Sequence, residues 1–175
     1  KVIIVDKGYI QVYTGNGKGK TTAALGLALR AICAGKKVFM GQFVKDMKYS
    51  EAKAEKYLPR FKIEQFGVGC FFDRKPDKKD IKAAEDGLKV IEDILIEGKY
   101  DVVIMDEINI ATYYNLLSPT KVIEVIEKRQ KNIEVILTGR YASDTIIEKA
   151  DLVTEMKEIK HYYTEGVIAR DGIER

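Results

Sequence analysis

Tryptophan is absent from this 175-residue chain, histidine occurs once, cysteine twice and proline three times. Cys33 and Cys70 match no metal-binding spacing and cannot build a disulfide framework, which favours a reducing cytoplasm and two structural thiols. The apolar run at residues 1–5 is far too short for a signal peptide or a membrane span. We therefore expect a soluble cytoplasmic protein that makes no use of a membrane.

The chain also lacks a large excess of positive or negative charge. The 30 lysines and arginines are interspersed with 27 aspartates and glutamates, and the formal net charge is +3. Because no basic stripe is present, a nucleic-acid partner is not expected. There are no repeats or low-complexity segments, and the length suits a single domain over residues 1–175, which would bury about 70% of its unfolded surface.

Apolar segments of two kinds alternate along the chain. Short apolar runs predict strands at residues 2–5, 9–13, 37–44, 62–66, 101–105, 133–137 and 152–156. Helical periodicity and end signals predict helices at residues 21–34, 50–58, 77–98, 118–129 and 143–150. The first of these helices is apolar nearly all round, so we expect it to be buried against the sheet and to end at Gly35. The alternation predicts an α/β fold, a three-layer sandwich around a mostly parallel sheet.

Residues 13–22 read Y-T-G-N-G-K-G-K-T-T, between the second strand and the first helix. Glycines let successive backbone NH groups point into one concavity, and the helix adds the positive end of its dipole. In such a P-loop, Lys20 would reach the outer phosphates and the Thr21 hydroxyl would face a magnesium ion. The setting predicts a P-loop NTPase fold of the RecA-like type.

The loop departs from the usual G-x-x-x-x-G-K-[ST] pattern. Thr14 stands where the first glycine is expected, and Gly15 comes one place late. A glycine-rich turn that binds nothing is the alternative. However, a lysine beside a helix amino terminus opposes the dipole unless an anion is present, which favours nucleotide phosphate. A dinucleotide-binding G-x-G-x-x-G is excluded because Lys20 occupies the third glycine position.

Polar residues follow three other strands. Asp106 and Glu107 come directly after D-V-V-I-M, an arrangement in which a carboxylate engages magnesium or its water shell; an acidic helix cap is the alternative. Gln42 and Lys45 end the strand at 37–44, although a solvated lysine is equally consistent with the pattern. Arg140 follows the strand at 133–137, where its planar fork suits a phosphate.

Three reactions fit a magnesium-nucleotide site. A small P-loop kinase needs an arginine-bearing lid, but residues 45–76 are short and contain only Arg60 and Arg74 as arginines. Hydrolysis of ATP, with a regulatory or partner-coupled role, needs a residue such as Glu107 to orient water. In the third reaction the triphosphate leaves as a unit, and the cations Lys18 and Lys20 would stabilise it.

The motifs resemble, in order and over nearly the whole chain, the P-loop family of ATP:cob(I)alamin (corrinoid) adenosyltransferases. They are T-G-N-G-K-G-K-T-T-A-A-L-G-L-A-L-R-A, Q-F-V-K, V-V-I-M-D-E, T-G-R, A-D-L-V-T-E-M, K-H and G-V-I-A-R-D-G-I-E. Threonine at the first-glycine place belongs to that family's pattern. The resemblance implies that Co(I) of a reduced corrinoid attacks the 5′ carbon of ATP and expels inorganic triphosphate, in adenosylcobalamin synthesis or salvage.

The resemblance also implies roles for individual residues. Lys18, Lys20 and Glu107 would be catalytic, and Thr21, Asp106 and Glu107 would serve magnesium. The nucleotide would lie reversed relative to ordinary NTPases, with the γ-phosphate in the loop. The expected ATP-binding residues are Thr14, Gly15, Asn16, Gly17, Lys18, Gly19, Lys20, Thr21, Thr22, Gln42, Lys45 and Arg140.

The central loop departs from the family's usual G-x-G-F-T-W, since residues 67–72 read G-V-G-C-F-F. The resemblance implies that Phe71 and Phe72 contact the corrinoid and displace its lower ligand; buried anchoring of the loop is the alternative. His161, in the K-H element, is equally consistent with a structural and a functional role. A homodimer and a flavodoxin-type electron donor are the partners that the resemblance implies.

Overall fold

The computed structural model describes residues 7–45, 49–68 and 75–175. The strand expected at residues 2–5 lies outside these ranges, as do Cys70, Phe71 and Phe72. None of the helices within the described ranges is both long and apolar enough to cross a membrane.

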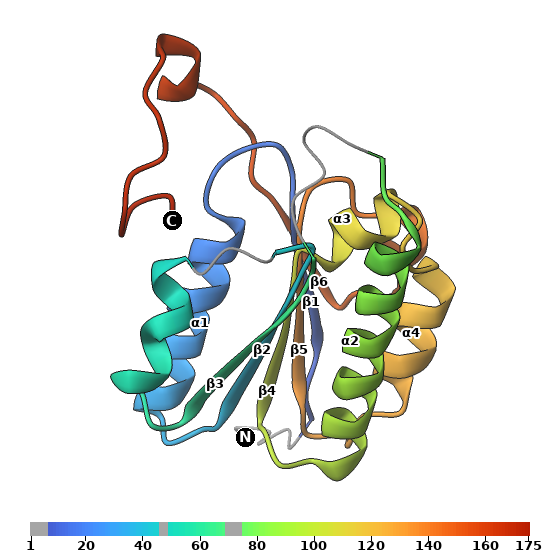
Figure 1. Cartoon of the computed structure of the whole chain (residues 1–175). Coiled ribbons are helices and arrows are strands. Elements are labelled where there is room, and N and C mark those ends of the chain that lie inside the picture. The colour runs from blue at the N-terminus through green and yellow to red at the C-terminus, as the bar shows by residue number, and fades with distance from the viewer. Residues whose placement is uncertain (1–6, 46–48, 69–74) are drawn as a thin grey trace.

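A six-stranded sheet with the order β3-β2-β4-β5-β1-β6 runs through the middle of the molecule (Figure 1). Every strand pair among the described residues is parallel, which confirms the predicted sheet. The observed bounds differ from the predicted ones by no more than one residue at either end. The strands are β1 Ile10–Thr14, β2 Val38–Phe43, β3 Phe61–Phe66, β4 Val102–Asp106, β5 Glu134–Thr138 and β6 Leu152–Glu155.

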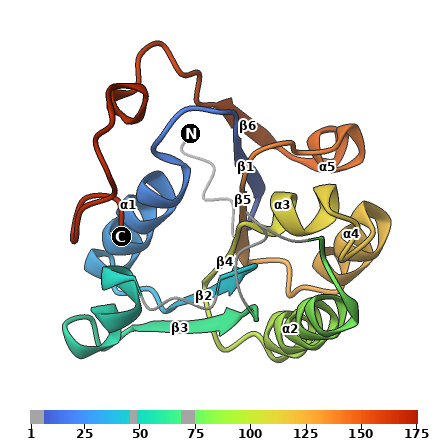
Figure 2. The same ribbon diagram turned by 45° about the horizontal axis from the view of Figure 1, so that its top comes forward.

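Helices cover the two faces of the sheet unequally (Figures 1 and 2). One face carries α1 (Lys20–Cys33) and the 3-10 helix η1 (Ser50–Lys56). The other carries the longer α2, which is seen nearly along its axis in Figure 2, and three shorter helices. These are α2 Lys78–Glu97, α3 Ile108–Tyr113, α4 Pro119–Glu127 and α5 Asp144–Lys149. The short α3, and η2 (Tyr162–Glu165) in the carboxyl-terminal segment, were not predicted from the sequence.

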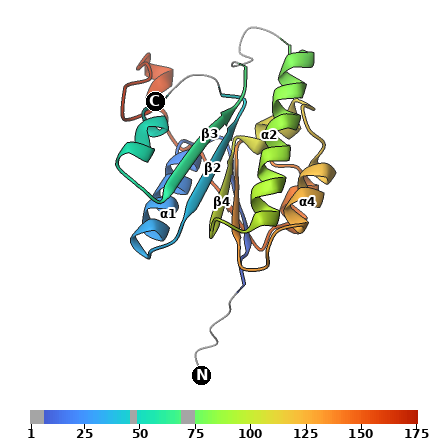
Figure 3. The same cartoon turned by 60° about the horizontal axis from the view of Figure 1, so that its bottom comes forward.

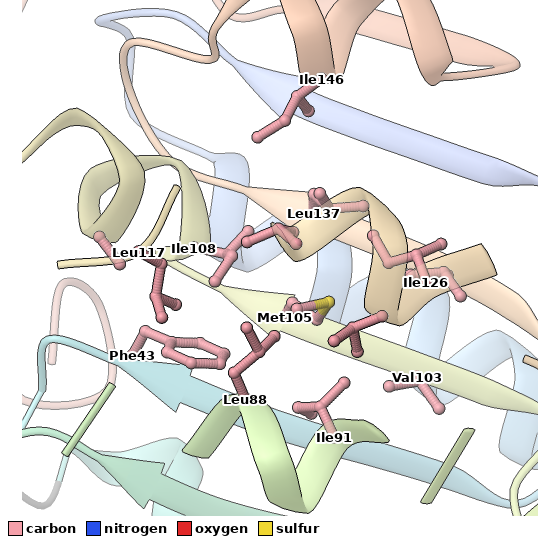
Figure 4. Packing of buried hydrophobic residues seen from close by; sticks show 14 of the residues in the cluster. Phe43, Leu88, Ile91, Val103, Met105, Ile108, Leu117, Ile126, Leu137 and Ile146 are labelled. Carbon is pink, nitrogen blue, oxygen red and sulfur yellow. The ribbon is translucent and has the colours of Figure 1, made fainter. Parts of the chain in front are cut away.

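The larger hydrophobic core lies between the sheet and α2 (Figure 4). Leu88 and Ile91 of α2 pack with Val103 and Met105 of β4, and each of the four is no more than 2% exposed. Burying a side chain of this size stabilises the fold by about 1.5–3 kcal/mol. This core fixes β4, the strand that ends in the predicted acidic pair.

The predicted burial of α1 was wrong in part. Only one stripe of the helix faces the sheet, and its apolar members Ala24, Ala28 and Ala31 are small, while Leu29 is 50% exposed. Alanines at spacings of three and four residues allow the helix to approach the sheet closely. The helix ends as predicted at Gly35 (φ 83°), whose NH donates to the Ile32 carbonyl at 2.8 Å.

All six parallel strands point their carboxyl ends to one edge of the sheet. The view in Figure 3 shows the opposite edge, where the chain enters β1. At the carboxyl edge lie the P-loop after β1, Lys45 after β2, Glu107 after β4 and Arg140 after β5. Residues predicted from separate motifs are thus gathered into one region, because parallel pairing forces their strands to end together.

Candidate active site

The P-loop connects Thr14 of β1 to Lys20 of α1. Gly15 (φ 96°) and Gly19 (φ 123°) lie in the region that disfavours any residue with a side chain. A Cβ atom on Gly15 would lie 2.5 Å from the carbonyl oxygen of Met156, and one on Gly17 would lie 2.7 Å from the same atom. Both glycines are therefore required by contacts with a residue far away in the sequence.

Met156 supports the loop from the end of β6. Its NH donates to the Thr14 carbonyl at 2.8 Å, and its own carbonyl accepts a hydrogen bond of 2.7 Å from the NH of Gly17. The A-D-L-V-T-E-M segment thus shapes the P-loop backbone. Sequence reasoning found this segment as a motif but did not predict its contact with the loop.

Thr14, at the place of the usual first glycine, has an anchoring contact. Its hydroxyl accepts a hydrogen bond of 3.3 Å from the NH of Ala142, in the turn that follows β5. That turn carries Arg140 and Tyr141. The threonine therefore joins the start of the P-loop to a second segment of the same site.

Lys20 is almost buried, with 8% of its surface exposed, and its Nζ donates to the Gly17 carbonyl at 2.7 Å. Burial lowers the pKa of Lys20, and the charge of Arg140 lowers it further, against the opposing effects of Glu107 and Asp106. A phosphate carries a full negative charge, whereas the Gly17 carbonyl is neutral. Lys20 is therefore placed to exchange its hydrogen bond with the carbonyl for one with a phosphate.

Asp106 is fully buried and accepts hydrogen bonds on both carboxylate oxygens. Oδ1 accepts from the hydroxyls of Thr21 (2.8 Å) and Thr138 (2.7 Å). Oδ2 accepts from Nε2 of Gln42 (3.2 Å) and Nζ of Lys45 (2.7 Å). Burial lowers the pKa of Lys45, but the charge and hydrogen bond of Asp106 outweigh it and the net shift is upward.

Glu107 begins α3 in a left-handed conformation (φ 59°), and its NH donates to the Thr138 hydroxyl at 3.0 Å. Glu107 occupies the amino-terminal cap position of α3, as the alternative of an acidic cap expects, but its side chain makes no capping hydrogen bond. The side chain instead borders the cavities above the P-loop. Burial raises the pKa of Glu107, and Asp106 raises it further, against Lys45, Lys20 and Arg140.

The oxygen donors Thr21, Asp106 and Glu107 fit magnesium, which prefers oxygen ligands. Within the described ranges no group of three histidine, cysteine, aspartate or glutamate side chains could hold a metal without further ligands. Magnesium commonly keeps several waters and is held by one or two carboxylates together with substrate phosphates. The residues present therefore fit an ion that arrives with the nucleotide.

Two adjoining cavities lie above the P-loop, of about 450 and 480 Å³. Both are bordered by Lys18, Lys20, Lys45, Glu107 and His161. Five other predicted residues border one cavity or the other: Gly17, Gly19, Thr21, Thr22 and Arg140. Those that border neither are Thr14, Gly15, Asn16, Gln42 and Asp106, two of which are fully buried.

The carboxyl-terminal segment folds back over the P-loop and α1 (Figure 1). Residues 172–175 border the 450 Å³ cavity, and Ser50 Oγ donates to the backbone oxygen of Arg175 at 3.0 Å. His161 Nδ1 accepts from the NH of Tyr163 at 3.0 Å, which caps η2 and gives this histidine a structural contact. The sequence did not predict that this segment returns to the site.

Phe66 is the last residue of β3, and its ring packs between the sheet and α2. A Cβ atom on Gly41 of β2 would lie 2.6 Å from the Phe66 ring, and one on Gly87 of α2 would lie 2.4 Å from it. The ring also packs edge-on against Phe43, with centroids 5.4 Å apart. The two glycines make room for this ring between the sheet and α2.

Residues 6–175 match the family described as ATP:corrinoid adenosyltransferase BtuR/CobO/CobP. This chain belongs to the ATP:corrinoid adenosyltransferase family. It is 35% identical to the corrinoid adenosyltransferase of Pseudomonas aeruginosa over 97% of this chain and 84% of the relative. It is 34% identical to that of Escherichia coli K12 and 33% to corrinoid adenosyltransferase CobA of Salmonella typhimurium, each over 97% of this chain and 86% of the relative.

The predicted family is thereby confirmed. The chain is a transferase whose substrates are ATP and a corrinoid. The P-loop, the carboxylates at the end of β4 and the cationic side chains around them lie together at the carboxyl edge of the sheet.

Proposed function

We propose that this protein transfers the 5′-deoxyadenosyl group of Mg-ATP to the Co(I) centre of a corrinoid and releases inorganic triphosphate. In this step an electron pair of Co(I) forms the cobalt–carbon bond while the bond from C5′ to the phosphate oxygen breaks, and the electrons of that bond leave with the triphosphate. The observation that carries the proposal is the convergence of Lys18, Lys20, Lys45 and Arg140 on the cavities above the P-loop. Such a group of cations stabilises charge that develops on a leaving group.

The chain need supply no general base, because Co(I) is itself the nucleophile. We assign to Lys18 and Lys20 the stabilisation of the departing triphosphate, and to the P-loop backbone with Arg140 its binding. The remaining work is orientation of the two substrates and exclusion of water. Two of the site residues that border neither cavity act indirectly: Thr14 anchors the loop, and Gln42 holds the buried Asp106.

Magnesium forms part of the proposal. The 2.8 Å hydrogen bond between Thr21 and Asp106 places a hydroxyl and a carboxylate together beside the loop. Glu107, which borders both cavities, is the better placed carboxylate for direct contact. Asp106 already accepts four hydrogen bonds, so it would act by orienting Thr21 toward the ion.

The same proposal includes the expected partners and location. A second copy of this chain, a flavodoxin-type electron donor and a cytoplasmic setting would suit an enzyme that needs a corrinoid reduced to Co(I). Phe71 and Phe72, outside the described residues, are proposed to contact the corrinoid. These parts rest on the family resemblance of the motifs.

An anaerobic assay with chemically reduced Co(I) cobalamin and Mg-ATP tests the reaction. We expect a light-sensitive alkylcobalamin spectrum with triphosphate released in equal amount, and a loss of roughly 100-fold or more in Lys20→Ala. Lys36→Ala, an exposed lysine just past the far end of α1, is the matched control and should retain full activity. Orthophosphate without alkylation would instead indicate a hydrolytic P-loop protein with a regulatory role.

A further inference from the structure

Tyr141 has a backbone conformation that a tyrosine rarely adopts. Its φ is 62°, in the left-handed region, where a side chain crowds the backbone and glycine is favoured. It follows Gly139 (φ 128°) and Arg140 in the turn between β5 and α5. Strain of this kind persists only where the surrounding structure holds it, and it gathers at ligand sites.

Two buried contacts hold the turn in place. The Asn109 side chain, which is fully buried in α3, donates from Nδ2 to the Gly139 carbonyl at 3.2 Å. On the other side of Tyr141, the NH of Ala142 donates to the Thr14 hydroxyl at 3.3 Å. The backbone of Tyr141 is therefore held on both sides within the turn.

Tyr141 also stacks on a second exposed ring. Its centroid lies 4.3 Å from that of Tyr113, with 29° between the ring planes, and Tyr113 meets Tyr114 edge-on at 5.4 Å. The three side chains come from two elements, yet they gather in one place and remain 47%, 53% and 42% exposed, for Tyr141, Tyr113 and Tyr114 respectively. We call these three residues the tyrosine cluster.

The tyrosine cluster adjoins the phosphate site. Tyr141 and Tyr114 border the 480 Å³ cavity, which is also bordered by Lys18 and Lys20. The apolar residues Val44 and Ile110 border it as well. A flat ligand resting on the Tyr141 ring would therefore lie beside the nucleotide, where the two substrates of a transferase must meet.

We propose that Tyr141, stiffened by Tyr113, supports the corrin macrocycle and helps to set which corrinoids are accepted. This inference rests on the proposed function. Because Tyr113 already covers the Tyr141 ring on one side, the pair offers a one-sided surface, whereas a slot for adenine encloses the base on both faces. A macrocycle is broad, and its amide side chains can accept hydrogen bonds from tyrosine hydroxyls at the edge of an apolar surface.

Two variants separate the ring from the backbone. Tyr141→Gly removes the ring and suits the left-handed conformation, so it should fold at least as stably as the parent chain. Tyr141→Phe keeps the ring and removes the hydroxyl. Tyr57→Ala, a tyrosine that is 79% exposed and lies just after η1, is the matched control.

The measurements are the KM for chemically reduced cobalamin, the KM for ATP, and binding of hydroxocobalamin by equilibrium dialysis without turnover. We expect Tyr141→Gly to raise the corrinoid KM and the dialysis Kd roughly tenfold and to leave the ATP KM within about twofold. Tyr141→Phe should change the corrinoid values by less than about threefold, and Tyr57→Ala should change none of them.

An unchanged corrinoid Kd in Tyr141→Gly would overturn the inference, and so would a rise confined to the ATP KM, which would place adenine on the ring. Failure of the parent chain to alkylate Co(I) cobalamin would instead overturn the proposed function. Dialysis still tests the role of Tyr141 in that case, because it measures corrinoid binding without catalysis. If the parent chain does not bind cobalamin at all, both the proposed function and the inference about Tyr141 are overturned.

Discussion

Lys18 of the P-loop donates a hydrogen bond of 3.0 Å from its Nζ to the backbone oxygen of Ile173, 155 residues further along the chain. Its ammonium also lies 3.9 Å from the carboxylate of Glu174. The carboxyl-terminal segment therefore contacts the loop that is proposed to bind triphosphate. Removing the Lys18 side chain would remove both the hydrogen bond to Ile173 and the ion pair with Glu174.

In the absence of nucleotide, Lys18→Ala should loosen this segment. Loss of one hydrogen bond, worth about 1 kcal/mol, should speed amide exchange of residues 162–175 about fivefold. Hydrogen exchange followed by mass spectrometry measures this directly, with Lys36→Ala as the control. Unchanged exchange in Lys18→Ala would show that other contacts hold the segment.

The buried pair of Asp106 and Lys45 should be costly to break from one side. Asp106→Asn removes the carboxylate 2.7 Å from the Lys45 ammonium and leaves only the more distant Glu51 at 3.8 Å, so we expect the free energy of unfolding to fall by about 3 kcal/mol. Lys45→Met combined with Asp106→Asn should recover part of that loss. Urea unfolding of the two single variants and the double variant measures the coupling, and strictly additive effects would contradict it.

Gly87→Ala in α2 should destabilise the protein even though alanine favours helix. The helix preference contributes about 1 kcal/mol, whereas a Cβ atom 2.4 Å from the Phe66 ring forces overpacking that costs about 1–3 kcal/mol. We expect a lower melting temperature.

Gly26→Ala in α1 is the matched substitution. A Cβ atom at Gly26 meets nothing within 4 Å, so the helix preference should prevail and the melting temperature should rise. If both alanine variants raise or both lower the melting temperature, close packing against Phe66 does not explain the effect of Gly87→Ala.

Glu174 should titrate at unusually low pH. Hydrogen bonds from Arg170 and Tyr162 lower its pKa to about 2. A carboxyl whose pKa is depressed in the folded state adds stability above its unfolded value near 4.5, and that contribution is lost as the pH falls from there toward about 2. NMR titration of the Glu174 carboxyl carbon measures the pKa, and Arg170→Ala should raise it toward 4.5.

The parts of this site that sequence reasoning predicted are those encoded by neighbours in the chain. The P-loop, the acidic pair at the end of β4 and Arg140 after β5 each stand at the end of a strand whose apolar run is visible in the sequence. Parallel pairing then brings their carboxyl ends together without further information. The family resemblance added the reaction and the substrates.

The parts that were missed depend on contacts between distant segments. Nothing local to Met156 indicates that its carbonyl accepts from Gly17, and nothing local to Tyr141 indicates a left-handed backbone or a stack on Tyr113. The burial of α1 was misjudged for the same reason, since an apolar helix surface does not reveal that only one stripe faces the sheet. The hydrogen bond from the Ala142 NH to the Thr14 hydroxyl gives a physical reason for a threonine at the place of the usual first glycine.

The hydrogen bond from Gly17 to the Met156 carbonyl bears on affinity as well as on shape. A loop that is folded around an atom of its own protein has lost its conformational freedom before any nucleotide arrives. The conformational entropy of the P-loop is lost when the protein folds, so ordering the loop does not weaken ATP binding. Weakening β6, the strand directly before Met156, should therefore reduce ATP affinity without any change in the groups proposed to touch phosphate.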